Sequence, residues 1–298
     1  MTAAPPRRPF GKTGLVVPAL GWGAAAVGDP ALSEIEAEVL LNSVLDLGID
    51  LIDTARSYGA SEERIGRHLA RRRGEFILST KVGYGVPGHD DWTADCVSAG
   101  VDLALSNLRT DVIDVVHLHS CPRDTLERRG VAEALVRAVE AGKVRVAAYS
   151  GDGQPLDWAV SSGLFGSVQA SVNLVDQRAI ETALPVARER GLGVIAKRAL
   201  ANAVWRRASA REEDPAIATY RHRWSALGFD FGGLPAEELA LRFAANVAGV
   251  HAVLVASTRV EHLRDNAAAI SRGPLPEELT RAIRARFRER GGDWSGVV

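Results

Sequence analysis

Short apolar runs alternate with longer amphipathic stretches along most of the chain. Eight of these runs have the length and composition of buried strands, namely Ala19–Trp22, Ile49–Ile52, Phe76–Thr80, Ile113–Leu118, Val144–Tyr149, Ser167–Val172, Gly193–Ala196 and Val250–Val255. The amphipathic stretches predict helices, for example Ser33–Leu47, Thr93–Leu108, Val131–Ala141, Glu181–Arg190 and Ala236–Asn246. Strict alternation of strand and helix predicts an α/β fold with a parallel sheet.

The number of units favours a closed barrel. Eight strand–helix units in about 250 residues fit a (β/α)8 TIM barrel better than an open doubly wound sheet. Ahead of the first unit, Phe10–Val17 with the turn Lys12-Thr13-Gly14 predicts an N-terminal β-hairpin that could plug one mouth. No repeat or second domain is visible, so we expect a single barrel domain over residues 1–298, with residues 1–8 as a flexible arm.

One segment departs from the alternation of predicted strands and helices. Ala201–Gly233 is much longer than the roughly 2–6 residues that usually join a strand to its helix. It contains several aromatic residues, namely Trp205, Tyr220, Trp224, Phe229 and Phe231. Two interpretations stay open: a lid or specificity wall over the barrel, or a surface helix with a small core of its own.

Composition narrows the class of protein. A formal net charge of −1 argues against nucleic acid or an anionic membrane as a main partner. Two cysteines, Cys96 and Cys121, do not make a secreted disulfide framework, and they fit a reducing cytoplasm. Met1–Pro9 lacks the apolar stretch of a signal peptide, and no apolar run approaches the roughly 20 residues of a membrane span. We expect a cytoplasmic monomer or small homo-oligomer.

Polar residues with matching chemistry follow three successive predicted strands. Asp53 follows Ile52, and Tyr58 lies five positions later on the loop, beside Gly59. Ser61 then predicts the N-cap of a helix. Lys81 and His119 follow the next two strands.

Strand ends converge on one face of a barrel, so these four side chains should share a pocket. Asp53 can hold the ammonium of Lys81 near Tyr58, where a positive charge stabilises a phenolate. Tyr58 can then donate a proton to a carbonyl oxygen, while His119 donates a second hydrogen bond. None of these groups can deliver two electrons, so the set implies a cofactor that donates hydride.

The same residues admit other interpretations. Singly, Asp53 could be a turn residue, Lys81 a solvated cation and His119 a core histidine. His117 shares a face with His119 and is expected one layer deeper as a hydrogen-bonded core residue. A barrel metal hydrolase would use His117, His119 and Asp53 as ligands, but it leaves Tyr58 and Lys81 without a role.

The ordered set of motifs resembles the aldo-keto reductase family. The pieces that carry the resemblance are Phe10-Gly11-Lys12-Thr13-Gly14-Leu15, Asp53-Thr54-Ala55 through Tyr58-Gly59, Ser61-Glu62, Lys81-Val82-Gly83, Asp111 to His119, and Ser257-Thr258-Arg259 through Asp265-Asn266. The resemblance implies that Asp53, Tyr58, Lys81 and His119 form the catalytic tetrad. It implies an NAD(P)H-dependent oxidoreductase that interconverts an aldehyde, ketone or aldose with an alcohol. A non-catalytic nicotinamide-binding regulatory subunit is the alternative.

The resemblance also implies the cofactor contacts. It places Ser150 and Gln169 at the nicotinamide carboxamide, although Gly151-Asp152 follows Ser150 where the family usually has Asn. Many members have a stacking aromatic after the seventh strand, whereas this chain has Lys197-Arg198. Opposite Ser257-Thr258-Arg259, these two cations predict an anion site for the pyrophosphate.

We expect the adenosine end of the cofactor to lie at the start of the helix that follows the eighth predicted strand. Arg259 is placed for a 2′-phosphate, with Ser257 and the helix N-terminus assisting. His262 stands where the family often has a stronger cation, and Asp265 and Asn266 match its adenine contacts. We therefore expect NADP, with NAD possible, and no metal. Candidate substrate-contacting residues are Trp92, Cys121 and Trp224.

Overall fold

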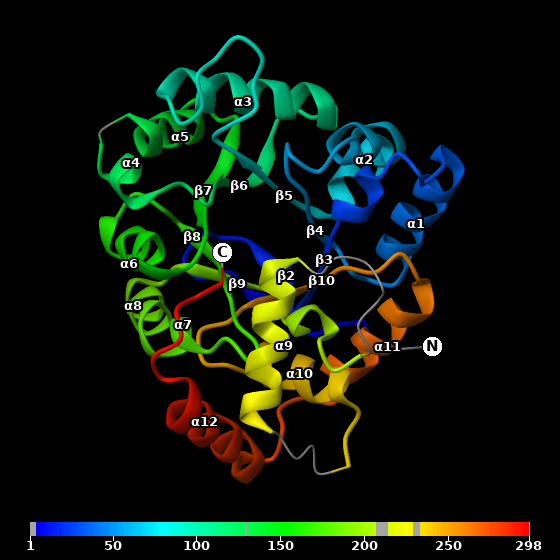
Figure 1. The fold of residues 1–298 in the computed structure, drawn as a ribbon. Coiled ribbons are helices and arrows are strands. Elements are labelled where there is room, and N and C mark those ends of the chain that lie inside the picture. The colour runs from blue at the N-terminus through cyan, green and yellow to red at the C-terminus, as the bar shows by residue number, and fades with distance from the viewer. Residues whose placement is uncertain (1–3, 129, 207–213, 229–232, 298) are drawn as a thin grey trace.

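Eight parallel strands close into a barrel (Figure 1). The computed structural model describes residues 4–128, 130–206, 214–228 and 233–297. The barrel strands follow one another in the order of the chain and are β3 (Leu20–Gly23), β4 (Leu51–Asp53), β5 (Ile77–Val82), β6 (Ile113–His119), β7 (Val144–Ser150), β8 (Ser167–Ser171), β9 (Gly193–Lys197) and β10 (Ala252–Val255). The last strand, β10, pairs with both β9 and β3, which closes the ring and confirms the predicted TIM barrel.

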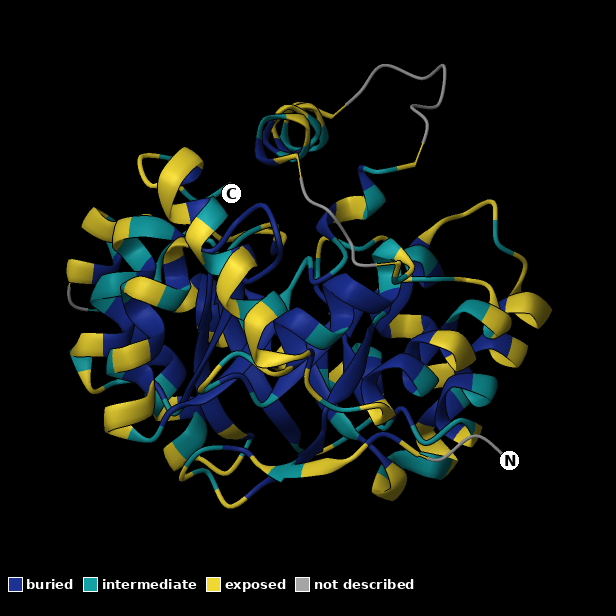
Figure 2. Cartoon of the chain, turned by 90° about the horizontal axis from the view of Figure 1, so that it is seen from below, coloured by how far each residue is buried: buried dark blue, intermediate teal, exposed yellow. Residues whose placement is uncertain are grey.

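Most of the helices form an outer layer and bury their apolar faces against the strands, whereas α9 lies over one end of the barrel (Figures 1 and 2). Their bounds are α1 (Glu34–Asp46), α2 (Ser61–Leu69), α3 (Ala94–Leu108), α4 (Arg123–Glu127), α5 (Val131–Glu140), α6 (Gly153–Ser162), α7 (Arg178–Glu181), α8 (Ala183–Arg190), α9 (Pro215–Leu227), α10 (Ala236–Ala245), α11 (Val260–Ser271) and α12 (Glu277–Gly291). The described residues also form the 3-10 helices η1 (Ala25–Gly28), η2 (Ala70–Glu75) and η3 (Ala201–Ala203). Among the described residues, no helix is both long and apolar enough to cross a bilayer.

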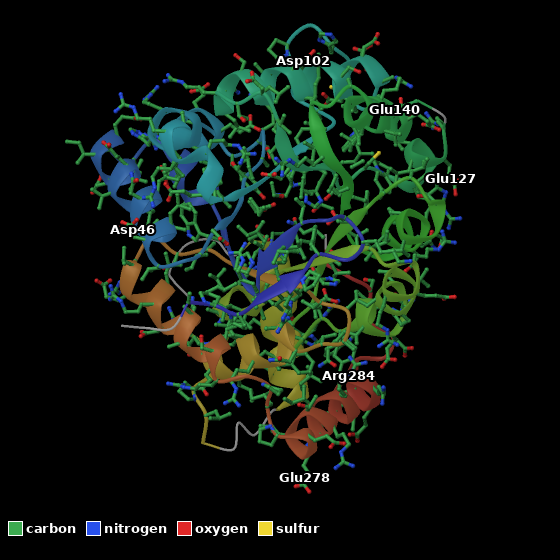
Figure 3. All side chains as sticks on the ribbon, turned by 180° about the vertical axis from the view of Figure 1, so that it is seen from behind. Asp46, Asp102, Glu127, Glu140, Glu278 and Arg284 are labelled. Carbon is green, nitrogen blue, oxygen red and sulfur yellow. The ribbon has the colours of Figure 1, made fainter. Side chains whose placement is uncertain are left out.

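An antiparallel hairpin of β1 (Arg7–Pro9) and β2 (Val16–Pro18) lies across the N-terminal end of the barrel, as Figure 3 shows. Phe10, in its turn, is completely buried in the apolar layer that fills this end. The hairpin forms where it was predicted, but its two strands extend beyond the predicted range Phe10–Val17 at both ends. The expected arm is too long, because Arg7 and Arg8 belong to β1, and Arg8 donates hydrogen bonds to the carbonyls of Ala245 and Val250.

The interrupting segment contains α9, which stands over the opposite end of the barrel (Figure 2). Tyr220 and Leu227 are buried in a second apolar cluster with residues of η3, α10 and α12. The expectation of a helix with its own small core is therefore correct. Phe229 and Phe231 lie outside the described residues, and the lid remains an expectation.

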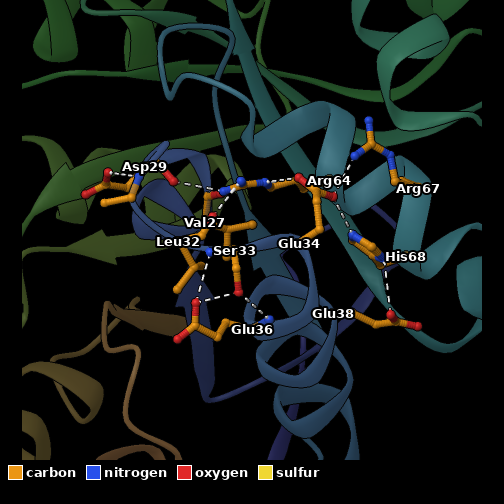
Figure 4. Close-up of polar contacts among 11 residues, drawn as sticks. Val27, Asp29, Leu32, Ser33, Glu34, Glu36, Glu38, Arg64, Arg67 and His68 are labelled. Atoms are coloured by element: carbon orange, nitrogen blue, oxygen red, sulfur yellow. Dashed lines mark hydrogen bonds and ion pairs between the residues drawn. The ribbon is translucent and has the colours of Figure 1, made fainter.

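Arg64 on α2 ties the loop that follows β3 to the outer layer (Figure 4). Its buried guanidinium donates to the carbonyls of Val27, Asp29 and Leu32 and to the carboxylate of Glu34. Arg64, His68 and Arg67 hold the pKa of Glu34 down at about 2. This cluster fixes η1, and η1 in turn supports the loop after β4.

Candidate active site

Asp53 and Lys81 form a buried ion pair at the C-terminal end of the barrel. The ammonium of Lys81 lies 2.5 Å from Asp53 Oδ2 and 2.7 Å from the carbonyl oxygen of Thr54. Both side chains are at most 4% exposed. Burial by itself opposes ionisation of both groups, but their mutual attraction outweighs it, so the pKa of Lys81 is raised and that of Asp53 is lowered. Both therefore carry charge at neutral pH.

A hydrogen-bond network beneath the pair positions Asp53. The hydroxyl of Ser79 donates to Asp53 Oδ1 at 2.7 Å, and the side-chain amide of Gln169 donates to the same oxygen at 3.0 Å. His117 Nε2 lies 3.1 Å from the Ser79 hydroxyl, which accepts from it because the serine proton is already directed to Asp53. His117 is completely buried, as expected for a core histidine.

Tyr58 projects from the loop between β4 and α2. The ammonium of Lys81 lies 4.9 Å from the centroid of its ring. Gly28 supports this loop from below: its carbonyl accepts from the backbone N–H of Ala60, and a Cβ at Gly28 would lie 1.6 Å from the Tyr58 carbonyl oxygen. Ser61 is not the N-cap that was predicted, because Ala60 takes that position and the Ser61 hydroxyl bonds to Ala24 and Thr54.

His119 completes the group of four. Its ring meets that of Tyr58 edge-on at a centroid distance of 6.1 Å. Burial and the charge of Lys81 lower the pKa of His119 to about 3, so the imidazole is neutral at neutral pH. Its Nδ1 lies 2.8 Å from the hydroxyl of Tyr84, a residue that the sequence motifs did not point to.

The same contacts argue against the rival metal hydrolase. Asp53 is bonded to Ser79, Lys81 and Gln169, and the ammonium of Lys81 would repel a cation at that position. Within the described part of the chain, no cluster of three or more His, Cys, Asp or Glu residues is arranged to hold a metal ion.

A cavity of about 430 Å³ opens above the four side chains. The predicted residues that line it are Asp53, Tyr58, Lys81, His119, Ser150, Gln169, Lys197 and Arg198. Ser120 and Asn202 contribute further polar groups that sequence reasoning missed, since turn residues of this kind carry no distinctive spacing. The barrel thus brings residues from several strands and loops to one space.

Ser150 and Gln169 are paired across adjacent strands of this cavity. The register places them side by side, and the Ser150 hydroxyl donates to Gln169 Oε1 at 2.9 Å. Because Gln169 also donates to Asp53, it links the expected carboxamide position directly to the ion pair.

Lys197 and Arg198 are already engaged with the protein. Lys197 lies 3.0 Å from the buried carboxylate of Asp152, which also accepts from Ser171. Arg198 donates to the carbonyl of Val297 near the end of the chain. The sequence predicted that these two cations form an anion site, but it did not indicate that Asp152 pairs with Lys197, because the two residues are far apart in sequence.

A second cavity of about 470 Å³ adjoins the first and shares Leu200, Ala203 and Ala256 with it. The predicted residues that line it are Ser257, His262, Asp265 and Asn266. Thr258 and Arg259 are exposed and outside this lining, with Arg259 as the N-cap of α11. The charged residues that sequence reasoning missed here are Arg206, Glu237, Glu238 and Arg272.

The three candidate substrate contacts lie away from the first cavity's lining. Cys121 is completely buried. Trp92 packs against Tyr84 at a centroid distance of 5.6 Å and so lies one layer behind His119. Trp224 lies on α9, and its ring packs against that of Trp205 at a centroid distance of 5.2 Å.

Comparison with known proteins agrees with this arrangement. The model of the aldo/keto reductase family matches residues 19–286. An L-galactose dehydrogenase from Arabidopsis thaliana is 27% identical over 288 residues, which cover 89% of this chain and 88% of that protein. A D-threo-aldose 1-dehydrogenase from a Pseudomonas species is 30% identical over 221 residues, which cover 61% and 66% of the two chains.

A solved structure is similar over nearly the whole chain. The holo form of an aldo-keto reductase from Bacillus halodurans superposes with a TM-score of 0.80 at 25% identity, covering 94% of this chain and 95% of that one.

Proposed function

Because this chain belongs to the aldo/keto reductase family, we propose that it is a nicotinamide-dependent oxidoreductase that interconverts a carbonyl and an alcohol. The observation that carries the proposal is the buried Lys81–Asp53 pair beside Tyr58 and His119 at one cavity. The assignment of Tyr58 as the proton donor is part of the proposal.

The roles follow from charge and distance. Asp53 keeps Lys81 charged and holds it against the ring of Tyr58, where its field stabilises the phenolate that remains after proton donation. His119, which is neutral, donates a hydrogen bond to the same substrate oxygen. The bound cofactor supplies or accepts the two electrons as a hydride.

The two adjoining cavities suit an extended dinucleotide. Ser150 and Gln169 offer both donors and acceptors for a carboxamide in the first cavity, and Asn266 offers the same for an adenine in the second. We propose NADP as the preferred form, because the guanidinium of Arg259 lies at the start of α11, where it can bind a phosphate, and the imidazole of His262 follows three positions later. Glu237 and Glu238 line the same cavity, but both are already paired with arginines, Glu237 with Arg206 and Glu238 with Arg242 and Arg272.

The proposed substrate is an aldehyde, ketone or aldose. The first cavity is rich in polar side chains, which fits a hydroxylated substrate, and two similar proteins are named as sugar dehydrogenases. The two cysteines are free and buried, which fits the cytoplasmic site of action that we propose.

The test is oxidation of NADPH and NADH across a panel of aldehydes, ketones and aldoses, repeated with Tyr58→Phe. This substitution removes only the hydroxyl, so turnover should fall by at least about 10² while cofactor affinity is retained. Near-normal turnover in the variant would contradict the assignment of Tyr58. Cofactor binding without turnover in the wild type would favour a regulatory subunit, and bound zinc on metal analysis would favour the hydrolase.

A further inference from the structure

Tyr84 is held rigidly beside His119. Its ring stacks on the imidazole with centroids 5.6 Å apart and planes inclined by 21°, and it also packs against Trp92. Its hydroxyl lies 2.8 Å from His119 Nδ1 and 3.2 Å from the hydroxyl of the exposed Ser57. Every polar contact of the phenol is thus with Ser57 or His119 among the described residues.

A neutral imidazole carries its proton on one nitrogen, and the other nitrogen can only accept. Nδ1 of His119 is engaged by Tyr84, and no partner for Nε2 is found in the part of the chain that the structure describes. His119 lines the first cavity, so Nε2 is the nitrogen available to a ligand there. The direction of the contact with Tyr84 therefore decides whether Nε2 donates or accepts.

Acid strength determines that direction. A phenol, with a pKa of about 10, is a stronger acid than a neutral imidazole N–H, and an imidazole nitrogen is a better acceptor than a phenol oxygen. The single phenol proton could instead be donated to the Ser57 hydroxyl, which lies 3.2 Å away, but the imidazole nitrogen is nearer and is the better acceptor. Ser57 can then donate its own proton to the phenol oxygen, because a hydroxyl both donates and accepts.

We propose that Tyr84 is a positioning residue, whose hydroxyl donates to His119 Nδ1 and holds the ring as the Nε2–H tautomer. This inference rests on the proposed function, because the Nε2–H is then the donor that meets the substrate oxygen. In the other tautomer, a nitrogen lone pair would face the oxygen lone pairs of the carbonyl and would repel them. The stacking of Tyr84 keeps the ring in place, and its hydroxyl selects the proton position.

The variant Tyr84→Phe separates these two contributions, because it keeps the stacked ring and removes the donor. The matched control is Tyr149→Phe, which removes the hydroxyl of a buried tyrosine that donates to the carbonyl of Cys121 at 3.1 Å. Nitrogen-15 NMR of histidine-labelled protein without substrate reports the tautomer, and His119→Asn identifies the signal. Carbonyl reduction is measured in parallel.

The wild type should show His119 protonated at Nε2. In Tyr84→Phe the signal should become a mixture of tautomers and kcat/KM should fall about tenfold, whereas Tyr149→Phe should retain the wild-type signal. An Nδ1–H tautomer in the wild type would overturn the inference. It would also be overturned if Tyr84→Phe left the tautomer unchanged, or if Tyr149→Phe altered it equally. Because the spectra need no turnover, they decide this question even if no substrate is found and the proposed function fails.

Discussion

At the scale of single residues, the Asp53–Lys81 pair is the most constrained feature of the molecule. Two opposite charges are removed from water, and the attraction between them over 2.5 Å keeps both groups ionised despite their burial. Removing one partner leaves a buried charge without compensation, so the two residues should act as one unit in turnover.

A double-mutant cycle tests this coupling. Lys81→Met should lower turnover and cost about 3–5 kcal/mol of stability, because Asp53 is left buried and unpaired. Asp53→Asn removes the opposite charge, so the second substitution should cost little once the first has been made. The kcat/KM of the double variant relative to wild type should therefore exceed the product of the relative kcat/KM values of the two single variants by about tenfold or more. The four proteins are compared by steady-state kinetics. Free energies that add within about 0.5 kcal/mol would show that the residues act independently.

At the scale of elements, the loop that carries Tyr58 depends on η1. Gly28 has no space for a side chain, since its Cβ would lie 1.6 Å from the Tyr58 carbonyl oxygen. Gly28→Ala should therefore displace the loop, lower kcat by at least about tenfold and reduce stability by about 1–3 kcal/mol. Gly74→Ala is the control, because nothing lies within 4 Å of its Cβ. Normal kinetics in Gly28→Ala would show that the loop tolerates the shift.

The start of α11 carries the prediction on cofactor preference. Arg259→Ala should weaken NADPH binding by about 1.5–3 kcal/mol and leave NADH nearly unchanged, because only NADPH has a phosphate for this guanidinium. Arg264→Ala, an exposed cation on the same helix, controls for general charge effects. Affinities are obtained from quenching of tryptophan fluorescence. Equal losses for both cofactors would assign Arg259 to a group that NADPH and NADH share, and no loss for either cofactor would contradict the role proposed for Arg259.

Sequence patterns predicted the helices and strands well, but they did not predict which side chains pair with one another. Periodicity located the barrel strands, and the spacing from Asp53 to His119 placed four side chains that the fold brings together. Lys81 proved to lie within β5, because the strand extends to Val82. The ion pair of Lys197 with Asp152 could not be predicted, because it depends on how the ends of β7 and β9, which are separated by β8 in the barrel, meet in space.

At the scale of the whole molecule, α9 and the C-terminal segment meet over the barrel at Asp176. This buried carboxylate accepts from the Tyr220 hydroxyl and from the backbone N–H of Val297. Arg223 donates to the carbonyl of Ser295 nearby. Burial and the charge of Asp152 raise the pKa of Asp176 to about 6.

This shift gives stability a defined pH dependence. Between about pH 4 and pH 6 the folded state binds more protons at Asp176 than the unfolded state, so this residue's contribution to stability falls as pH rises through that window. The variant Asp176→Asn has no carboxyl group at this position, so it does not show this loss of stability as the pH rises. Its free energy of unfolding relative to wild type should therefore rise by about 2–3 kcal/mol from pH 4 to pH 7, as measured by urea unfolding. A difference that is flat with pH would contradict the prediction.

The hydrogen bonds that converge on Asp53 Oδ1 also limit how this sequence can evolve. Ser79 and Gln169 lie on different strands, yet each donates a hydrogen bond to the same oxygen. His117 in turn donates to the hydroxyl of Ser79. A substitution at one of these positions changes which residues are acceptable at the others. A library in which these three positions are randomised together should therefore contain active combinations whose single substitutions are each inactive. Few single substitutions at these positions should be tolerated, so we expect them to change together, and not one at a time, during evolution.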